Sequence, residues 1–405
     1  QGLGREVDLS FADFPSPRAR SMFLRPWLPC SRACVARYGA AAGAARLQLR
    51  RKSTSGSVAL GQTWRIAAVD ISALLRRDDA SGSRQAAKQL SDAFADTGFA
   101  IVIGTGVSTK QMARLRGLAY QFFEQGLDAK NAVNDGHGEG YGEKPYCYLE
   151  ENGAQLLGDF SRPTDIVESL TYRGLSELEV QAQLPQSPAG LKEEMMEFND
   201  SLAEMRRALE KTCELALGLE DGFLGATCLG GQESLRLAYY PNVPASHILD
   251  GQMRYGAHVD SFGLTVLSLD PASPGGLQVN IDNAWVDVPF VEGSVVLNVG
   301  ALLSRWTNGR WQASVHRVLC NPGARLSIVS GAVRPRDDVL IEVFPSCRQP
   351  AGAPGGEGRG DFPPVLASDF YAERVAMHRP SYLQERGLSG QSVQQISDDI
   401  RNYRI

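Results

Sequence analysis

Two histidines and one aspartate in this 405-residue chain have the residue types and the spacing of a metal site. His258 and Asp260 lie two residues apart in the run Arg254–Leu264, and His316 lies far downstream in another apolar run. If the first run is a β-strand or a strand end, side chains two residues apart point the same way. Two imidazoles and one carboxylate on one face of a metal suit non-haem Fe(II) and leave the opposite face open.

The His-x-Asp motif alone leaves other interpretations open. Zinc accepts similar ligands, and hydrolases with two histidines and one carboxylate exist. A bare pair such as His258 and Asp260 is also more often a hydrogen-bonded surface pair than a metal site. The motif therefore needs support from the rest of the sequence.

Arg325 and Ser327 follow shortly after His316 on another apparent strand, again two residues apart. A buried guanidinium can form two parallel hydrogen bonds to a carboxylate, and a neighbouring hydroxyl adds a third. This pair could hold the distal carboxylate of a dicarboxylic acid. The alternative is an arginine exposed on an edge strand.

Taken together, these residues resemble the 2-oxoglutarate/Fe(II)-dependent dioxygenases, in particular the isopenicillin-N-synthase-like family. The resemblance covers roughly Trp64 to Met377. The motifs that carry it, in chain order, are Arg236-Leu-Ala-Tyr-Tyr-Pro241, His258-Val-Asp260, Leu264-Thr-Val-Leu267, Gly276-Leu-Gln-Val279, Trp285, Asn298-Val-Gly300, Thr307-Asn-Gly309, His316-Arg-Val318 and Arg325-Leu-Ser327.

The resemblance implies Fe(II) as cofactor and 2-oxoglutarate as cosubstrate, with ascorbate as a candidate auxiliary reductant. It implies an oxygenase that hydroxylates or desaturates a small organic metabolite with O2 and releases succinate and CO2. The residues it implies are His258, Asp260 and His316 for the metal, and Arg325, Ser327 and Tyr240 for 2-oxoglutarate.

Two other functions compete with this interpretation. One is an oxidase of the same fold that uses O2 without 2-oxoglutarate, which succinate formation would distinguish. The other is a non-catalytic barrel that only binds a ligand, which loss of metal binding would favour. Three departures from the family pattern are Ala238 in place of a frequent Asn, Ala301 in place of a frequent Asp, and Ser330-Gly-Ala-Val333 in place of an aromatic run. The first bears on how 2-oxoglutarate binds.

The elements expected to position these residues are many short strands after Ser234, separated by Gly, Pro and Asn. This pattern predicts a mainly β fold with flanking helices, whose core is a double-stranded β-helix, a cupin-like jelly roll. A long helix that starts at Ser187-Pro188 is expected to brace it. The predicted regions are a leader (1–60), an N-terminal α/β region (64–180), the bracing helix (187–220), the jelly-roll core (232–347) and a polar helical tail outside the barrel (361–405).

The substrate side is expected in loops, where aromatic residues gather over a rigid scaffold. The Gly- and Tyr-rich segment 134–158 has no clear period and includes Tyr141 and Tyr146. Phe262 follows the metal motif by two residues. These three aromatic residues are the candidates for substrate contacts.

Composition and charge indicate the compartment, the targeting and the partners of the protein. The net charge is -5, and the seven cysteines are scattered, which argues against a disulfide framework and for a reducing compartment. No acidic residue occurs between Phe14 and Val69, a stretch with many arginines, so the leader predicts a mitochondrial or plastid transit peptide. The alternatives are a disordered basic tail on a cytoplasmic protein, or sequence upstream of a start at Met22. Because the basic residues concentrate in this leader, the rest of the chain is acidic, which argues against nucleic acid as a partner. No apolar run is long enough to cross a bilayer, so no membrane partner is expected. The protein is expected to be a monomer.

Overall fold

The computed structural model describes residues 65–76, 79–134, 146–151, 163–173, 187–229, 234–348 and 361–376. The chain divides into two compact units, Gln1–Leu60 and Gly61–Ile405. The first unit lies outside the described residues, so the transit peptide stays a prediction. Within the described residues, no helix is both long enough and apolar enough to cross a bilayer.

A large, mostly antiparallel sheet forms the centre of the second unit. Its strands in spatial order are β1 (Ala67–Asp70), β2 (Phe99–Ile103), β10 (Val295–Val299), β7 (Leu264–Ser268), β12 (Arg325–Ala332), β5 (Ser234–Tyr240), β4 (Val167–Arg173) and β3 (Tyr146–Glu151). Only β1 and β2 pair in parallel among these strands. The sheet therefore joins the N-terminal region to the predicted core.

A smaller antiparallel sheet forms the second layer. It contains β6 (Tyr255–His258), β11 (His316–Val318), β8 (Leu277–Ile281) and β9 (Ala284–Asp287) in that order. A further pair consists of β13 (Leu340–Ile341) and β14 (Val365–Leu366). Two packed antiparallel sheets with helices at the side confirm the predicted mainly β, jelly-roll class.

Side-chain alternation explains how the smaller sheet faces the larger one. On β8, Leu277, Val279 and Ile281 are buried, while Gln278 and Asn280 between them are partly exposed. Strand side chains alternate between faces, so β8 has one apolar face toward the core and one toward solvent. By contrast, every residue of β10 is buried, because this strand lies inside the larger sheet with both faces covered.

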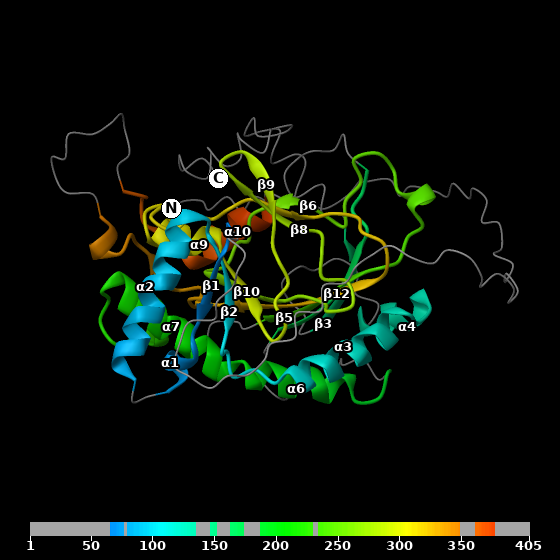
Figure 1. Cartoon of the computed structure of the whole chain (residues 1–405), viewed down its shortest axis with the longest axis horizontal. Coiled ribbons are helices and arrows are strands. Elements are labelled where there is room, and N and C mark those ends of the chain that lie inside the picture. The colour runs from blue at the N-terminus through cyan, green and yellow to red at the C-terminus, as the bar shows by residue number, and fades with distance from the viewer. Residues whose placement is uncertain are drawn as a thin grey trace, which may run out of the picture. The chain divides into compact units, whose positions relative to one another are not determined.

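Helices cover the outer side of the larger sheet, opposite β6, β8 and β9 (Figure 1). The Ser108 side chain caps α3 by accepting a hydrogen bond from the backbone N–H of Gln111. The described helices are α1 (Ser72–Leu75), α2 (Ala80–Asp96), α3 (Thr109–Phe123), α4 (Leu127–Asn131), α6 (Leu191–Ser201), α7 (Ala203–Leu217), α8 (Phe223–Cys228), α9 (Ala301–Trp306) and α10 (Ala367–Ala376), with 3-10 turns η1 (Ala132–Asn134), η3 (Ala245–His247) and η4 (Pro345–Cys347).

The predicted single bracing helix is wrong in two details. It begins at Leu191 rather than at Pro188, because Gly190 before it adopts a left-handed conformation with φ of 88°. It is also interrupted at Leu202, which separates α6 from α7. Gly218, again left-handed, then ends α7.

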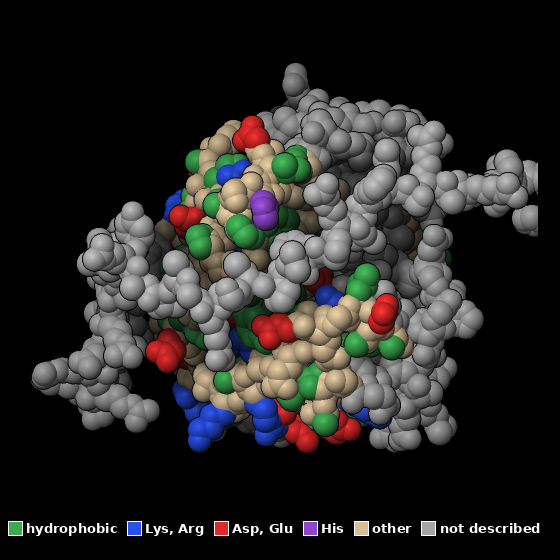
Figure 2. Space-filling view, turned by 90° about the vertical axis from the view of Figure 1, so that its right-hand side faces the viewer, with side chains coloured by type: hydrophobic (Ala, Val, Ile, Leu, Met, Phe, Trp, Pro, Cys, Tyr) green, Lys and Arg blue, Asp and Glu red, His purple; other side chains and the backbone are tan. Residues whose placement is uncertain are grey.

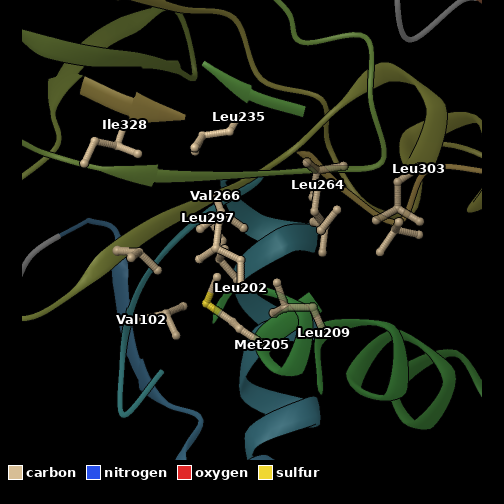
Figure 3. Close-up of a cluster of buried hydrophobic side chains, with 14 of the residues drawn as sticks. Val102, Leu202, Met205, Leu209, Leu235, Leu264, Val266, Leu297, Leu303 and Ile328 are labelled. Atoms are coloured by element: carbon tan, nitrogen blue, oxygen red, sulfur yellow. The ribbon is translucent and has the colours of Figure 1, made fainter. Parts of the chain in front are cut away.

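The bracing role itself is visible in the core. Leu202, Met205 and Leu209 are almost completely buried and pack toward Val266 of β7 and Leu297 of β10 (Figure 3). Lys, Arg, Asp and Glu side chains gather along the lower edge of the molecule in Figure 2, on the outer side of the same helical layer. The helices are therefore amphipathic, and their apolar sides hold the larger sheet in place.

The tail was expected to be a polar helix outside the barrel, and its described part, α10, has one apolar side that packs against the core. Ala367 and Phe370 of α10 are buried and belong to the main apolar core. Tyr371 of the same helix lies 6.4 Å from Phe262, measured between ring centroids. The helix therefore packs beside the segment that follows the metal motif.

Candidate metal and cosubstrate site

The two histidines face each other across neighbouring strands. His258 ends β6, His316 begins β11, and the two are direct partners in the antiparallel register. Their ring centroids are 4.1 Å apart. Each Nδ1 lies within hydrogen-bond distance of a backbone carbonyl, that of Gly256 at 2.9 Å and that of Ser314 at 3.1 Å. A carbonyl only accepts, so each Nδ1 carries the proton and each Nε2 is left as a metal donor.

Asp260 completes the group. It lies in the turn after β6 rather than on a strand. Its Oδ1 is 3.4 Å from Nε2 of His258 and 3.7 Å from Nε2 of His316. The turn is held because the Asp260 carbonyl accepts a hydrogen bond from the backbone N–H of Ala301 at 2.7 Å. The closeness was predicted correctly, and Asp260 lies two residues beyond the last residue of β6 rather than within the strand.

The other carboxylate oxygen of Asp260 has its own partners. Oδ2 accepts hydrogen bonds from the Thr265 hydroxyl and from Nδ2 of Asn298, the latter at 2.7 Å. Both donors lie on neighbouring strands of the larger sheet, β7 and β10. These two bonds fix the rotation of the carboxylate, so Oδ1 remains turned toward the two histidines. Sequence reasoning missed this role, although both residues lie in motifs of the family resemblance.

Electrostatics sets the protonation states that a metal needs. Burial opposes the charged form of Asp260, but the nearby His316 and His258 and the hydrogen bond from Asn298 outweigh it and hold its pKa far below the usual range. Burial, helped by repulsion from His258, lowers the pKa of His316 to about 4. At neutral pH the site therefore presents an anionic carboxylate and a neutral imidazole, both metal donors.

The three side chains form a metal-ready group. One donor atom from each of His258, Asp260 and His316 lies within 4.8 Å of the other two. Two imidazoles and one carboxylate match the Fe(II) ligand set of oxygenases. Zinc would accept the same donors. The residues present therefore fit a divalent metal, and the local geometry alone does not choose between the two.

The hydrogen bonds that hold Oδ2 of Asp260 lead to a testable prediction. Replacing Thr265 with Val removes one hydrogen bond to Oδ2 with little change in shape, and we expect it to weaken Fe(II) binding by about 10- to 100-fold. Thr265→Ser retains the hydroxyl and should bind iron like the parent. Equilibrium dialysis of Fe(II) under nitrogen measures the affinity. An unchanged affinity in the Val variant would show that Oδ2 needs no such support.

Arg325 and Ser327 lie together on β12, in a second polar group. Arg325 is completely buried, and its Nε lies 3.4 Å from the Ser327 hydroxyl, so this alternation prediction is correct. Its Nη1 donates to the backbone carbonyl of Gly275 at 2.5 Å. Its Nη2 is buried with no hydrogen-bond partner among the described residues. Tyr240 of β5 is the register partner of Arg325, and the guanidinium carbon lies 5.6 Å from the centre of its ring.

The buried Nη2 of Arg325 is a donor that could meet an anionic ligand. Leaving a buried donor unsatisfied costs about 1–3 kcal/mol, and more for a charged group. Natural interiors rarely accept that cost without a ligand or water. A carboxylate that meets Nη2 and the Ser327 hydroxyl would remove it. The residues therefore fit the far carboxylate of a dicarboxylic acid.

Asp270, which sequence reasoning missed, anchors the strand that carries Arg325. Its carboxylate is buried and accepts hydrogen bonds from the backbone N–H of Leu326 and of Ala272, both at 2.9 Å. It also accepts from the Tyr120 hydroxyl of α3 and lies 3.9 Å from Nε of Arg116. This network ties α3 to the start of β12 and to the turn before β8.

Removal of this anchor should destabilise the protein. We expect Asp270→Ala to lower the free energy of unfolding by on the order of 3 kcal/mol, because Arg116 would remain buried without its carboxylate. Urea denaturation measures the change. Asp287→Ala, at an exposed position of β9, is the control and should stay within about 0.5 kcal/mol of the parent. Equal stability of the two variants would contradict the anchoring role.

The predicted substrate residues are only partly visible. Tyr141 lies outside the described residues, and the side chain of Tyr146, at the start of β3, is also outside them. Phe262 is partly buried, and its ring lies 3.7 Å from the place that a Cβ would take if residue 331 were not glycine. The guanidinium carbon of Arg334 lies 4.6 Å from the ring centre of Tyr371 and 5.7 Å from that of Phe262. Arg334 and Tyr371 were not predicted, because nothing near them in sequence links them to the metal motif.

Helix α10 also carries a charged residue, Arg374, that interacts electrostatically with the metal-binding residue Asp260. Burial lowers the pKa of Arg374 to about 10, while the negative charges of Glu373 and Asp260 act in the opposite direction. This interaction between the charges of Arg374 and Asp260 agrees with a position of α10 near the metal group. The contact between the rings of Tyr371 and Phe262 agrees with the same position.

Comparison with known proteins agrees with this geometry. Two family profiles match the chain, the 2OG-Fe(II) oxygenase superfamily at residues 231–331 and the N-terminal region of the non-haem dioxygenases in morphine synthesis at residues 66–181. The chain is 30% identical to the 2-oxoglutarate-dependent dioxygenase ecdK of Aspergillus rugulosus, over 56% of this chain and 73% of the relative. It is 29% identical to homoarginine-6-hydroxylase 2-ODD-C23 of Glycine max, over 64% of this chain and 83% of the relative.

Solved structures show the same fold. A full-length protein of Neurospora crassa, crystallised in complex with alpha-KG, superposes with a TM-score of 0.65 at 25% identity, over 77% of this chain and 96% of the other. The rice dioxygenase for auxin oxidation superposes with a TM-score of 0.60 at 23% identity, over 77% and 95% of the two chains. The similarity therefore includes the N-terminal region as well as the sheets that carry the metal group.

Proposed function

Because this chain belongs to the 2OG-Fe(II) oxygenase superfamily, we propose that His258, Asp260 and His316 hold its metal. The chain is an Fe(II)- and 2-oxoglutarate-dependent oxygenase that acts on a small organic molecule and releases succinate and CO2. The observation that carries the assignment of residues is the convergence of three donor atoms within 4.8 Å. Family membership favours Fe(II) over the zinc that the same donors would accept.

The cosubstrate is held in the second polar group. Arg325 and Ser327 bind the far carboxylate of 2-oxoglutarate, and the orphaned Nη2 of Arg325 supports this role. Tyr240, which is the register partner of Arg325, forms one side of the same pocket. Because Arg325 is completely buried, its interaction with an anion is screened little by water.

When bound at His258, Asp260 and His316, Fe(II) with 2-oxoglutarate would supply the activation of O2 that couples loss of CO2 to oxidation of a C–H bond of the substrate. The chain contributes position and protonation state. The backbone carbonyls at Nδ1 keep both histidines in the donor tautomer, and Thr265 with Asn298 holds the Asp260 carboxylate in one rotation. Three protein donors leave the remaining positions of the metal open to ligands from outside the chain.

The substrate is proposed to bind on the side of the metal group where α10 packs. Phe262 and Tyr371 offer aromatic surface there, and Arg334 lies over the Tyr371 ring. Aromatic side chains with a few polar groups are typical of small-molecule pockets. The names of relatives describe hydroxylases of small molecules such as homoarginine and scopoletin. Hydroxylation is accordingly the proposed outcome.

Succinate formation tests the function. Purified protein that lacks the leader is mixed with Fe(II) and 2-oxoglutarate under nitrogen, O2 is admitted, and succinate is quantified. We expect succinate from the parent and none from His258→Ala or from a reaction without iron. Iron-bound protein that consumes O2 with a substrate, yet forms no succinate, would identify the oxidase that does not use 2-oxoglutarate. Protein that binds no iron would favour a non-catalytic binding barrel.

A further inference from the structure

A second buried guanidinium, that of Arg254, lies beside the pocket assigned to 2-oxoglutarate. Arg254 directly precedes β6 and is 2% exposed, while Arg325 is 0% exposed. The guanidinium carbons of the two arginines lie 5.8 and 5.6 Å from the centre of the same Tyr240 ring. Two cations therefore share one aromatic side chain in the interior. Like charges in such a place repel and lose their hydration, so the arrangement needs an explanation.

The hydrogen bonds of Arg254 account for only part of its guanidinium. Nη2 donates to the backbone carbonyls of Asn321, at 2.8 Å, and of Gly323. These two carbonyls belong to the turn that leads directly into Arg325 and β12. Nη1 is buried and has no hydrogen-bond partner among the described residues, as is also true of Nη2 of Arg325. Each guanidinium thus has one donor nitrogen that the described part of the chain does not satisfy.

Neither arginine forms an ion pair with a carboxylate of the described residues, and the buried Asp165, which lies close to the strand after Arg254, accepts a hydrogen bond from the backbone N–H of Gly256. Asp270 is the carboxylate whose charge acts on Arg325, and its oxygens already accept from Leu326, Ala272 and Tyr120. The groups that raise the pKa of Arg254 are Cys320 and three tyrosines, none of which is a carboxylate. Burial lowers the pKa of both arginines, and the charge of Arg254 lowers that of Arg325 further. Within the described part of the chain, the two guanidiniums at this end of the pocket therefore have no carboxylate paired with them.

We infer that Arg254 is a second guanidinium of the 2-oxoglutarate site, where it contributes positive charge and its free Nη1 to the far carboxylate. The inference rests on the proposed function, because it takes the Arg325 pocket as the place where the cosubstrate binds. The ligand class that satisfies both guanidiniums is a 2-oxo acid with a second carboxylate. A 2-oxo acid with a methyl group at the far end would leave both donors unpaired.

The consequence is selectivity between two kinds of 2-oxo acid. The keto acid end of either ligand meets the metal, so that part of the affinity should not depend on Arg254. Only a ligand with a far carboxylate gains from the second guanidinium. The ratio of affinities for 2-oxoglutarate and 2-oxohexanoate therefore isolates the contribution of Arg254. If Arg254 had only a structural role, its replacement would lower the affinities for both ligands by the same factor.

Calorimetry on the Fe(II)-loaded protein under nitrogen tests the inference without turnover. We expect Arg254→Met to reduce the affinity for 2-oxoglutarate by roughly tenfold or more and to leave that for 2-oxohexanoate unchanged. Arg254→Lys retains the charge and should keep most of the selectivity, and it serves as the second variant if the Met variant does not fold. Arg336→Met removes an exposed arginine from a loop and should change neither affinity.

The possible results distinguish a failure of this inference from a failure of the proposed function. If the affinities for both ligands fall equally in the Met and Lys variants, or if neither affinity falls, Arg254 only holds the turn at Asn321 and Gly323. The inference is then wrong. If the parent itself binds no 2-oxoglutarate while it holds iron, the proposed function fails together with the inference. A selective loss in the Met variant, with retention in the Lys variant, supports both.

Discussion

Asp260→Asn should abolish succinate formation. The amide has nearly the shape of the carboxylate, but it lacks the negative charge that faces Nε2 of both histidines. It would also bring a donor toward Asn298, which itself donates to Oδ2 of Asp260. A divalent metal would then have two neutral imidazoles and a misoriented amide as its ligands. Succinate measured at saturating Fe(II) and 2-oxoglutarate should fall to the background of the metal-free reaction.

Asn280→Asp is the control for the Asp260→Asn variant. It makes the opposite change on the partly exposed face of β8 and keeps an intact metal group. We expect its succinate formation to remain close to that of the parent. Substantial turnover in Asp260→Asn would mean that the metal is held elsewhere, since no other group of three His, Cys, Asp or Glu in the described residues could hold it.

Arg325→Met should raise the KM for 2-oxoglutarate by a large factor. Removing one partner of a buried, hydrogen-bonded charge pair costs about 2–5 kcal/mol, which corresponds to roughly 30-fold to several thousand-fold in affinity. The metal group does not contact Arg325 within the described residues, so kcat at saturating 2-oxoglutarate should change much less. Initial rates of succinate formation over a range of 2-oxoglutarate concentrations separate the two parameters.

Stability provides the control for Arg325. The substitution deprives the Gly275 carbonyl of a donor but also removes a buried nitrogen without a partner, so the two effects oppose each other. We therefore expect the unfolding free energy to stay within about 2 kcal/mol of the parent. Arg325→Lys keeps the charge without the planar fork and should fall between the parent and the Met variant in KM. An unchanged KM in both variants would remove Arg325 from the cosubstrate site.

The strands of the core were predictable from the sequence because each has its own local signal. The short apolar runs separated by Gly, Pro and Asn predicted short strands after Ser234, and β7, β10 and β12 are three of them. Arg325 and Ser327 were placed correctly for the right reason, since both lie on one regular strand. His258 and His316 came from motif order, and the register that makes them direct partners was not visible in sequence.

The misses arise where long-range contacts decide the structure. Asp260 approaches the histidines through a turn held by Ala301, Thr265 and Asn298, all distant in the chain or on other strands. Arg254 and Asp270 looked like ordinary polar residues at strand ends, and only burial reveals their roles. The break at Leu202 and the packing of α10 against the core likewise depend on tertiary contacts. Periodicity identifies which face of an element is apolar, but not what that face meets.

Iron binding under nitrogen tests the central claim most directly. The claim is that His258, Asp260 and His316 form one Fe(II) site, and equilibrium dialysis counts the iron bound per chain in the parent and in His316→Ala. His316 is buried and pairs directly with His258, so its loss removes one donor while leaving the surface unchanged. We predict one tightly bound iron in the parent and none in the variant. Equal iron content in the two proteins would contradict the account.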